Sequence, residues 1–320
     1  MTELRPMTLG TIFDRTIKAV FNKDAMKIIG IFSGLIIAGI GGIIGISFWI
    51  GPSIWSNFLD GAFAGTILNG IAMIAVAVIL GFIVLLIYIV YVLTASDVFS
   101  KRFLQQPILL RKTIFSKLRL IPRYLFYLLL ISILYGVFFA LYFLSIFALS
   151  RLAEISPVLS MLGIIGAVVV LGGFMTLLQT FLCPAVPCMV VENHGAWKSI
   201  MRSFKLIKPN FFRVLGVSFL FQIILTALMY FVMFLFAIPF SIFMAISASQ
   251  GAPSDTWLMM MPIMLAAMYI PAIIVHESLS HAFNVVIFYN QKIKTEGYGA
   301  EQLAESFISS IPHEGEPPVS

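Results

Sequence analysis

The stretch ILNGIAMIAVAVILGFIVLLIYIVYVL, residues 67–93, contains no charged side chain and decides the fold class. A bilayer core about 30 Å thick is crossed by about 20 apolar residues in an α-helix. This run is therefore long enough to span a membrane, and five further apolar runs predict five further spans. The six predicted spans are residues 28–50, 67–93, 124–149, 157–182, 214–247 and 258–289.

Helices and closed barrels are the two structures that satisfy their own backbone in lipid. The sequence lacks the alternating ten-residue pattern of barrel strands. We therefore expect an all-α fold, a polytopic bundle of six transmembrane helices. The last two runs exceed one crossing and contain Pro239, Pro262 and Pro271, so tilt or kinks are expected there. Residues 1–295 are predicted to form a single integral membrane domain, and residues 296–320 a cytoplasmic tail that is largely disordered.

The composition agrees with this prediction. Of the 320 residues 60% are hydrophobic and 11% charged, and the mean hydropathy is +1.04. An ordinary globular chain has about 45–50% apolar and about 25% charged residues. These values exclude a water-soluble enzyme, a disordered chain and a disulfide scaffold. The two cysteines, Cys183 and Cys188, are expected to be packing residues in a reducing compartment.

The basic residues predict the orientation of the chain in the membrane. Of the 20 basic residues, 19 lie before the first span, between the second and third spans, between the fourth and fifth, or after the sixth, and these segments share one side of the membrane. The exception is Arg151. Positively charged loops stay in the cytoplasm, so both termini are expected on that side. The membrane is expected to be the inner membrane of a bacterium or archaeon. Trp49, Trp55 and Trp257 then fall at the outer interface. The net charge of +6 indicates anionic lipid headgroups rather than nucleic acid as the partner.

A basic amphipathic segment precedes each odd-numbered span, over residues 9–21, 110–121 and 197–207. An apolar stripe opposite cations is typical of a helix lying in the headgroup plane. A spacing of about ninety residues predicts three repeats of interfacial helix plus transmembrane hairpin. The alternative is that these segments are ordinary cytoplasmic connections. The candidate contacts to anionic lipid are Arg15, Lys18, Arg111, Lys112, Lys198, Arg202 and Lys205.

The densest polar cluster of the predicted spans lies in the sixth, in HESLSH at residues 276–281. Zinc proteases carry HExxH, with histidines four apart, whereas His276 and His281 are five apart and diverge by about 140° on a helix. We therefore expect no metal site and no cofactor. Glu277 and His281 are four apart and are expected to meet. With Asn284 these residues form either a packing cluster at the interface or a proton or ion relay, and both interpretations stay open.

Small and polar residues inside the spans predict helix packing. Gly30 with Gly34, Gly41 with Gly45, and Gly61 with Gly65 have the small-xxx-small spacing of closely packed helices. Sparse polar side chains in the fourth and fifth spans are expected to form interhelical hydrogen bonds. These are Thr176, Gln179, Thr180, Gln222 and Thr226.

Three stretches together resemble a prokaryotic family of six-helix integral membrane proteins, the one related to the membrane domain of certain glycerophosphoryl diester phosphodiesterases. They are RPMTLGTIFDR from Arg5, VVENHGAWKSIMRSFKLIKPNFFRVLG from Val190 and FYNQKIKTEGYGAEQLAE from Phe288. In those phosphodiesterases the hydrolytic barrel is a separate soluble domain, which this sequence lacks. The resemblance therefore implies a membrane module without that activity.

The sequence contains no nucleophile elbow, P-loop or dinucleotide fingerprint. We accordingly expect a non-enzymatic membrane protein that organises lipids or a membrane partner complex. The alternative is a secondary transporter or channel for a small solute or ion, which needs a polar path at mid-depth. An intramembrane enzyme acting on lipid would need a convergent acid–base set, and we find none in the sequence.

Overall fold

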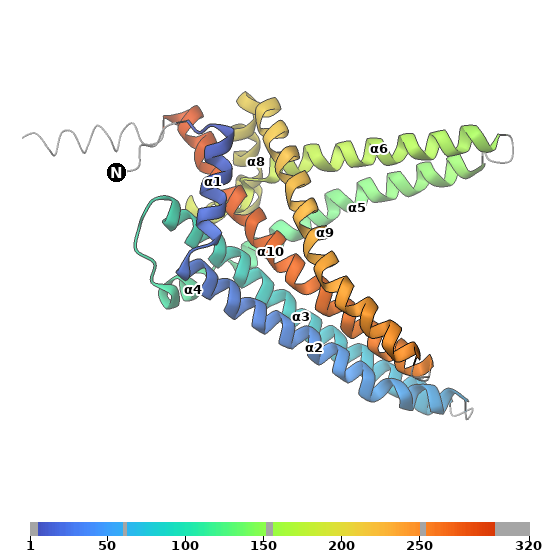
Figure 1. Cartoon of the computed structure of the whole chain (residues 1–320). Helices are drawn as coiled ribbons and strands as arrows, with labels where there is room; N and C mark the ends of the chain where they lie inside the picture. Colours follow the sequence, from blue (N-terminus) through green and yellow to red (C-terminus); the bar gives the residue numbers. More distant parts are fainter. Residues whose placement is uncertain (1–5, 60–62, 152–155, 250–253, 298–320) are drawn as a thin grey trace, which may run out of the picture. The chain divides into compact units, whose positions relative to one another are not determined.

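The computed structural model describes residues 6–59, 63–151, 156–249 and 254–297, and its regular structure within these ranges is entirely helical. Only the helical backbone is described for residues 46–59, 63–66 and 254–268 and for positions 44, 68, 69, 73, 236, 240, 243, 244, 247 and 248. The helices in chain order (Figure 1) are α1 (Leu9–Val20), α2 (Lys23–Leu59), α3 (Phe63–Phe103), α4 (Leu110–Leu118), α5 (Ile121–Arg151), α6 (Pro157–Leu182), α7 (Ala185–Val191), α8 (Ala196–Ile207), the short 3-10 helix η2 (Lys208–Asn210), α9 (Phe211–Ser249) and α10 (Ser254–Glu296).

Six helices of the described chain are long and apolar enough to cross a membrane: α2, α3, α5, α6, α9 and α10. The shortest of them, α6, has 26 residues. At 1.5 Å per residue it is about 39 Å long, which exceeds the hydrocarbon core of a bilayer. The all-α, six-span prediction is confirmed, and the chain is a multi-pass membrane protein.

The predicted end of an apolar run coincides with the end of the helix in α6 but not in α3. Helix α6 has the predicted bounds because Ser156 caps it, accepting a hydrogen bond from the backbone of Leu159 at 3.4 Å, and Pro157 occupies its first turn. Helix α3 continues past the predicted end to Phe103. Its charged last turns stay helical because Asp97 pairs with Lys101 one turn later, at 2.6 Å. Charge therefore ends an apolar run without ending the helix.

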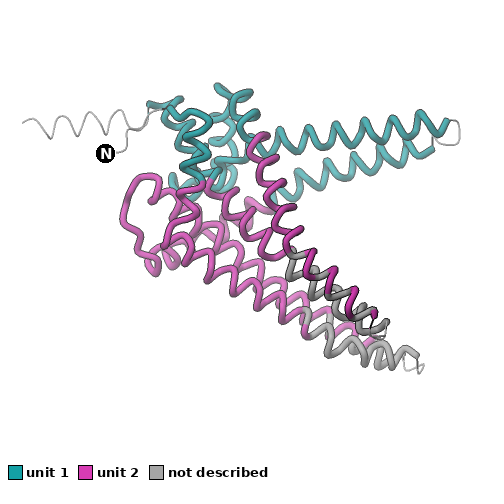
Figure 2. The backbone as a smooth tube through the Cα atoms, viewed as in Figure 1, with its two compact units in different colours: residues 1–16, 129–218, 283–320 teal, residues 17–128, 219–282 magenta. Residues whose placement is uncertain are grey.

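The chain divides into two compact units (Figure 2). Unit 1 comprises Met1–Thr16, Leu129–Ser218 and Phe283–Ser320, and unit 2 comprises Ile17–Leu128 and Phe219–Ala282. Four helices, α1, α5, α9 and α10, contribute residues to both units. A single domain over residues 1–295 stays a prediction. The predicted tail lies outside the described residues from position 298 onward.

Unit 2 is built on the antiparallel pair α2 and α3. A Cβ atom on Gly39 of α2 would collide with the side chain of Val84 on α3, and one on Gly42 would lie 4.0 Å from Leu80. The two backbones therefore approach each other at these glycines. The later part of α3 is buried on all sides, from Tyr91 through Ser100.

The glycine prediction was wrong in its choice of residues. No described atom lies within 4 Å of the Cβ position of Gly30, Gly34, Gly41 or Gly45. Four-residue spacing shows which glycines share a helix face, but the neighbouring helix meets the face that carries Gly39. The surroundings of Gly61 and Gly65, and the side chains of Trp49, Trp55 and Trp257, lie outside the described residues.

The last part of α10 is the centre of unit 1. Val285, Phe288 and Tyr289 are fully or almost fully buried, as are Cys188 and Met189 of α7. Both cysteines are buried and free, as the sequence predicts. Phenylalanine rings join α6 to its neighbours in this unit. The ring of Phe181 stacks on Phe204 of α8 at 4.6 Å and on Phe211 of α9 at 4.7 Å.

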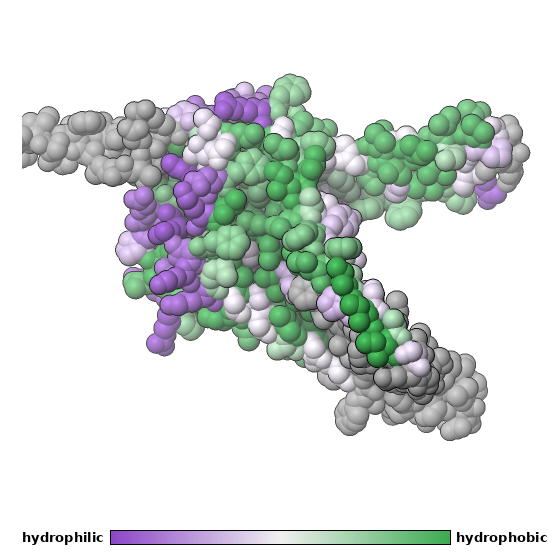
Figure 3. Space-filling view, in the orientation of Figure 1, coloured by the Kyte–Doolittle hydropathy of each residue, from purple (hydrophilic) through white to green (hydrophobic). Residues whose placement is uncertain are grey.

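Within unit 1, α5 and α6 form a hairpin whose visible face is mostly hydrophobic, with hydrophilic residues near its far end (Figure 3). The rings of Phe138 and Phe174 stack at 3.5 Å between centroids. The hydroxyl of Ser160 donates to the carbonyl of Leu149 at 2.9 Å. A stacked pair of rings and a side-chain hydrogen bond therefore join the two helices.

Two threonines do not follow the prediction of interhelical hydrogen bonds. Thr176 donates to the carbonyl of Gly172 and Thr180 to that of Thr176, each within α6. A threonine hydroxyl reaches the carbonyl one turn earlier without any help from a partner helix, which satisfies it locally.

A short helix lies directly ahead of each of three membrane helices: α1 before α2, α4 before α5 and α8 before α9. The predicted repeat of a short helix followed by a membrane hairpin is present in this element order. Whether these short helices lie in the headgroup plane stays a prediction.

Candidate functional site

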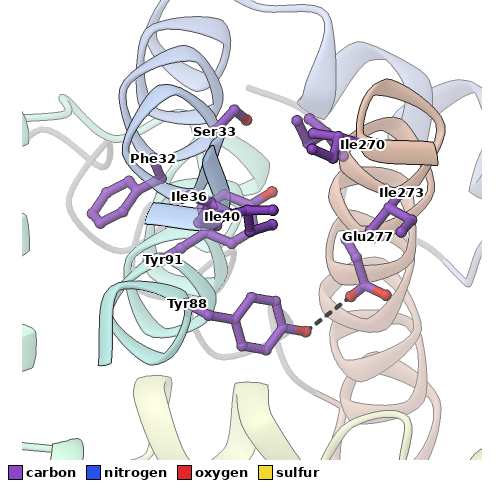
Figure 4. Close-up of a pocket in the computed structure, with 10 residues that line it drawn as sticks. Phe32, Ser33, Ile36, Ile40, Tyr88, Tyr91, Ile270, Ile273 and Glu277 are labelled. Atoms are coloured by element: carbon purple, nitrogen blue, oxygen red, sulfur yellow. Dashed lines mark hydrogen bonds between the residues drawn. The ribbon is translucent and has the colours of Figure 1, made fainter. Parts of the chain in front are cut away.

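Glu277 of α10 lies within hydrogen-bond reach of α3. The hydroxyl of Tyr88 donates to Glu277 Oε2 at 3.1 Å, and the two side chains point toward one another (Figure 4). One residue along α10, Ser278 shares a hydrogen bond with the hydroxyl of Tyr91 at 2.8 Å and donates to the carbonyl of Ile274. Two tyrosines thus fasten α3 to this turn of α10.

Both histidines of the predicted cluster lie beside the same carboxylate. His281 Nε2 is 3.5 Å from Glu277 Oε2, and His276 Nδ1 is 3.6 Å from Oε1. The expected contact between Glu277 and His281 is confirmed. Asn284 has another role: its side-chain oxygen accepts a hydrogen bond from the thiol of Cys183 at 2.9 Å, within unit 1.

A cavity of about 110 Å³ adjoins Glu277. Its wall is made of apolar side chains of α2 and α10, together with the two tyrosines of α3 (Figure 4). The lining residues are Phe32, Ser33, Ile36, Ile40, Tyr88, Tyr91, Ile270, Ile273, Ile274 and Glu277. Tyr88 and Tyr91 were not among the residues predicted for this site. The available signal was two hydroxyl groups three residues apart in an otherwise apolar run.

Chemically, the group formed by Tyr88, Glu277, His276 and His281 contains one carboxylate, two imidazole rings and one phenol hydroxyl. It is able to hold a cation or pass a proton between neighbours. Within the described residues, no group of three or more His, Cys, Asp or Glu side chains is placed to hold a metal ion.

The basic helix α4 presents two adjacent cations beside apolar side chains. Arg111 and Lys112 are exposed, and with Leu109, Leu110 and Phe115 they line a shallow groove of about 540 Å³. Leu109 is 65% exposed and Phe115 is 62% exposed. Figure 3 shows hydrophilic residues at the end of unit 2 where α4 lies. The groove thus combines positive charge with uncovered hydrocarbon.

The neighbouring lysine on α4 has a structural role. Lys117 binds Asp97 Oδ1 of α3 at 2.8 Å, and Lys101 binds Oδ2 of the same carboxylate. Lys101 also donates to the hydroxyl of Thr113 at 3.0 Å. The pairing of Asp97 with Lys101 follows the sequence prediction. These contacts fix α4 to α3 and do not involve the exposed Arg111 and Lys112.

Helix α8 in unit 1 repeats the combination of charge and apolar surface. Ser199, Ser203 and Leu206 form its buried face. Trp197 and Met201, one turn apart, are both exposed. Lys198 and Lys205 are exposed on the same helix. In the first amphipathic helix, Lys18 is exposed and Arg15 is half-buried.

Arg202 of α8 belongs to an ion-pair network instead of the exposed surface. Its Nε and Nη2 donate to the two oxygens of Glu192 at 3.0 and 3.1 Å, and its Nη1 lies 2.5 Å from Glu296. Lys292 of α10 donates to Glu192 at 2.9 Å, and His194 lies 3.3 Å from it. The candidate lipid contacts of α8 are therefore Lys198 and Lys205, because the charge of Arg202 is already paired.

The network affects the titration of its central carboxylate. Burial disfavours the charged form of Glu192, but the hydrogen bonds from Arg202 and Lys292 and their positive charges outweigh burial. The pKa of Glu192 is consequently held below its ordinary value. Glu192 stays negative at neutral pH and joins α7, α8 and the end of α10.

The same region of unit 1 brings together the three stretches that carry the family resemblance. The backbone N–H of Met7 donates to Asn290 at 3.0 Å, and Asn210 donates to Gln291 at 3.2 Å. Arg213 donates to the carbonyl of Met7 at 3.4 Å. These contacts give the stretches a shared structural role in one unit.

Comparison with protein-family models, with curated proteins and with solved structures found no match to this chain. The resemblance to the glycerophosphoryl diester phosphodiesterase membrane domain therefore stays a prediction.

Proposed function

We propose that this chain is a non-enzymatic membrane protein that binds anionic phospholipid headgroups through its basic amphipathic helices and so organises lipid or a membrane partner complex. In this proposal both termini are cytoplasmic and the membrane is the inner membrane of a bacterium or archaeon. The distribution of cations supports this orientation, since basic residues are retained on the cytoplasmic side.

The observation that carries the proposal is the groove on α4. Arg111 and Lys112 have no ion-pair partner within the described part of the chain, and uncovered Leu109 and Phe115 flank them. A phospholipid offers the complementary pair of groups, a phosphate for the cations and acyl chains for the apolar side chains. Each basic residue near an anionic surface contributes about 1 kcal/mol. The helix α8 offers the same combination with Lys198 and Trp197.

The test is retention of lipid by the full chain in nanodiscs that contain equal amounts of phosphatidylglycerol and phosphatidylcholine. Native mass spectrometry then counts the lipids that stay bound. We expect phosphatidylglycerol to be retained preferentially, and Arg111→Gln to weaken its binding about fivefold, the equivalent of about 1 kcal/mol. Arg151→Gln is the matched control. It also removes one positive charge, but from the last residue of α5, at the end of that helix that is farther along the chain from α4.

Equal retention of both lipids, or equal effects of Arg111→Gln and Arg151→Gln, would contradict the proposal.

The second candidate function is a secondary transporter or channel for a small solute or ion. The cavity beside Glu277 favours it, because that cavity brings an ionisable group next to space inside unit 2.

A further inference from the structure

The carboxylates of this chain differ in the charges that compensate them. Asp97 is paired with Lys101 and Lys117, and Glu192 with Arg202 and Lys292. These partners are permanently charged at neutral pH. Within the described residues, Glu277 instead has two histidines beside it and a tyrosine hydroxyl as donor. Histidine compensates a carboxylate only when it is protonated.

The apolar surroundings of Glu277 make the lack of a permanently charged partner energetically unfavourable. Its side chain is 31% exposed, and the wall of the adjoining cavity is almost wholly hydrocarbon. A carboxylate in such surroundings is stabilised by a counter-ion that shares them, since an unpaired charge in an apolar medium is strongly disfavoured. Because Glu277 lines the cavity, a positive charge on the cavity side would compensate its carboxylate without protonation of either histidine.

We propose that the cavity between α2, α3 and α10 binds an amphipathic organic cation, an amine with a compact hydrocarbon body, whose ammonium group pairs with Glu277. The hydrocarbon body fills the space lined by Ile36, Ile40 and Ile273. This ligand site shares no residue with the groove on α4, so it goes beyond the binding of phospholipid headgroups.

The size of the cavity fits a ligand of this class. A single water needs about 10–15 Å³ on the same measure, whereas this cavity offers about 110 Å³. The space therefore exceeds what one water or a bare inorganic cation requires. An inorganic cation would also need several oxygen ligands, which the isoleucine wall does not provide.

The aromatic rings of the site add to the recognition of a cation. Tyr88 and Tyr91 both line the cavity, and their ring centroids are 6.4 Å apart. An ammonium group is attracted to the face of a tyrosine ring, most strongly where water is excluded. The hydroxyl of Tyr88 meanwhile holds one carboxylate oxygen in place, which fixes the position of the ion pair.

Access to the cavity is through apolar surface. Ile273, in its wall, is 47% exposed. In a membrane this side chain contacts lipid. An amphipathic amine partitions into the bilayer and reaches the site from there, whereas a strongly hydrated solute does not.

The experiment measures equilibrium binding of radiolabelled 4-phenylbutylamine to the full chain in phosphatidylcholine nanodiscs, with empty nanodiscs subtracted. The neutral 4-phenylbutan-1-ol is the matched ligand. We expect saturable binding of the amine to the wild-type protein, about tenfold or more tighter than binding of the alcohol, the difference typical of a charge-assisted hydrogen bond.

Two variants separate the charge from the cavity. Glu277→Gln is expected to lower amine affinity about tenfold or more and to leave alcohol affinity unchanged. Ile36→Trp fills the cavity and is expected to abolish saturable binding of both ligands. Asp24→Asn removes an equal charge from α2 and is expected to change neither affinity. The unfolding temperature of each ligand-free variant shows whether it is folded.

The inference is overturned by equal affinity of the wild-type protein for amine and alcohol, by the absence of saturable amine binding, or by unaltered amine binding in Glu277→Gln. The comparison of the two ligands uses the wild-type protein alone, so it stands even where a variant fails to fold. The proposed headgroup function is tested separately, since Arg111→Gln is expected to leave amine binding unchanged.

Discussion

Arg202 and Glu192 form a two-pronged ion pair in which the guanidinium Nε and Nη2 each donate to a different carboxylate oxygen, at 3.0 and 3.1 Å. The geometry matches the planar fork of arginine to the two oxygens of glutamate. The pair joins the connection after α7 to α8, and Glu296 and Lys292 extend it to the end of α10.

Loss of this pair is expected to destabilise the protein. Arg202→Ala should lower the free energy of unfolding by about 1–3 kcal/mol, because it removes two hydrogen-bond donors from a largely buried carboxylate. Unfolding of the purified protein by increasing denaturing detergent measures the effect. Lys205→Ala, which removes an exposed cation from the same helix, is expected to change stability by less than about 0.5 kcal/mol. Equal losses for the two variants would show that the ion pair contributes nothing specific.

The same carboxylate predicts an acid-sensitive contribution to stability. The pKa of Glu192 is lower in the folded chain than its ordinary value of 4.5. Its stabilisation is therefore fully present above pH 4.5 and is lost as the pH falls through the lowered folded-state pKa. We expect the difference in unfolding midpoint between wild type and Glu192→Gln to shrink as the pH falls from 7 to 3. A difference that stays constant or grows with acid would contradict the assignment.

The close approach of α2 and α3 predicts unequal effects of glycine substitution. Gly39→Leu places a side chain against Val84 and should cost about 1–3 kcal/mol of stability, typical of overpacking. Gly34→Leu on the same helix meets no described atom and is expected to be neutral or slightly stabilising, because leucine favours helix over glycine. Thermal unfolding in detergent compares the two variants. A larger loss of stability in Gly34→Leu than in Gly39→Leu would show that α3 does not contact the face of α2 that carries Gly39.

Helix α8 is expected to lie at the depth of the lipid headgroups. Trp197 is 58% exposed on a helix whose exposed lysines are Lys198 and Lys205. With the other tryptophans replaced by phenylalanine, its fluorescence should be quenched most by bromine atoms near the glycerol region and less by bromine deep in the acyl chains. Strong quenching by iodide in the water phase, together with no quenching by brominated lipid, would show instead that α8 is an ordinary aqueous connection.

The sequence was sufficient for the six membrane helices because each depends on a local property, the length of an apolar run. It was sufficient for the contact of Glu277 with His281 and of Asp97 with Lys101 because four-residue spacing places both partners on one helix face. Neither prediction needs any knowledge of which helices are neighbours.

Predictions that depended on a second helix were incomplete. Arg202 was assigned to lipid because its cationic neighbours are close in sequence, whereas Glu296 is far along the chain. Tyr88 was passed over for the same reason, since nothing in the apolar run of α3 shows that α10 brings a carboxylate to it. The choice of Gly39 over Gly34 likewise depends on which face α3 covers.

Both candidate polar centres need α10, which contributes Glu277 to unit 2 and Lys292 and Glu296 to unit 1. During synthesis this helix leaves the ribosome after α2 to α9. Until it is inserted, Tyr88 has no carboxylate to bind, and Arg202 has Glu192 without the support of Lys292. A nascent chain that stalls before α10 thus lacks the partners of a tyrosine in the membrane-spanning part of α3 and of an ion pair on α8, so both polar centres are completed only by the last helix.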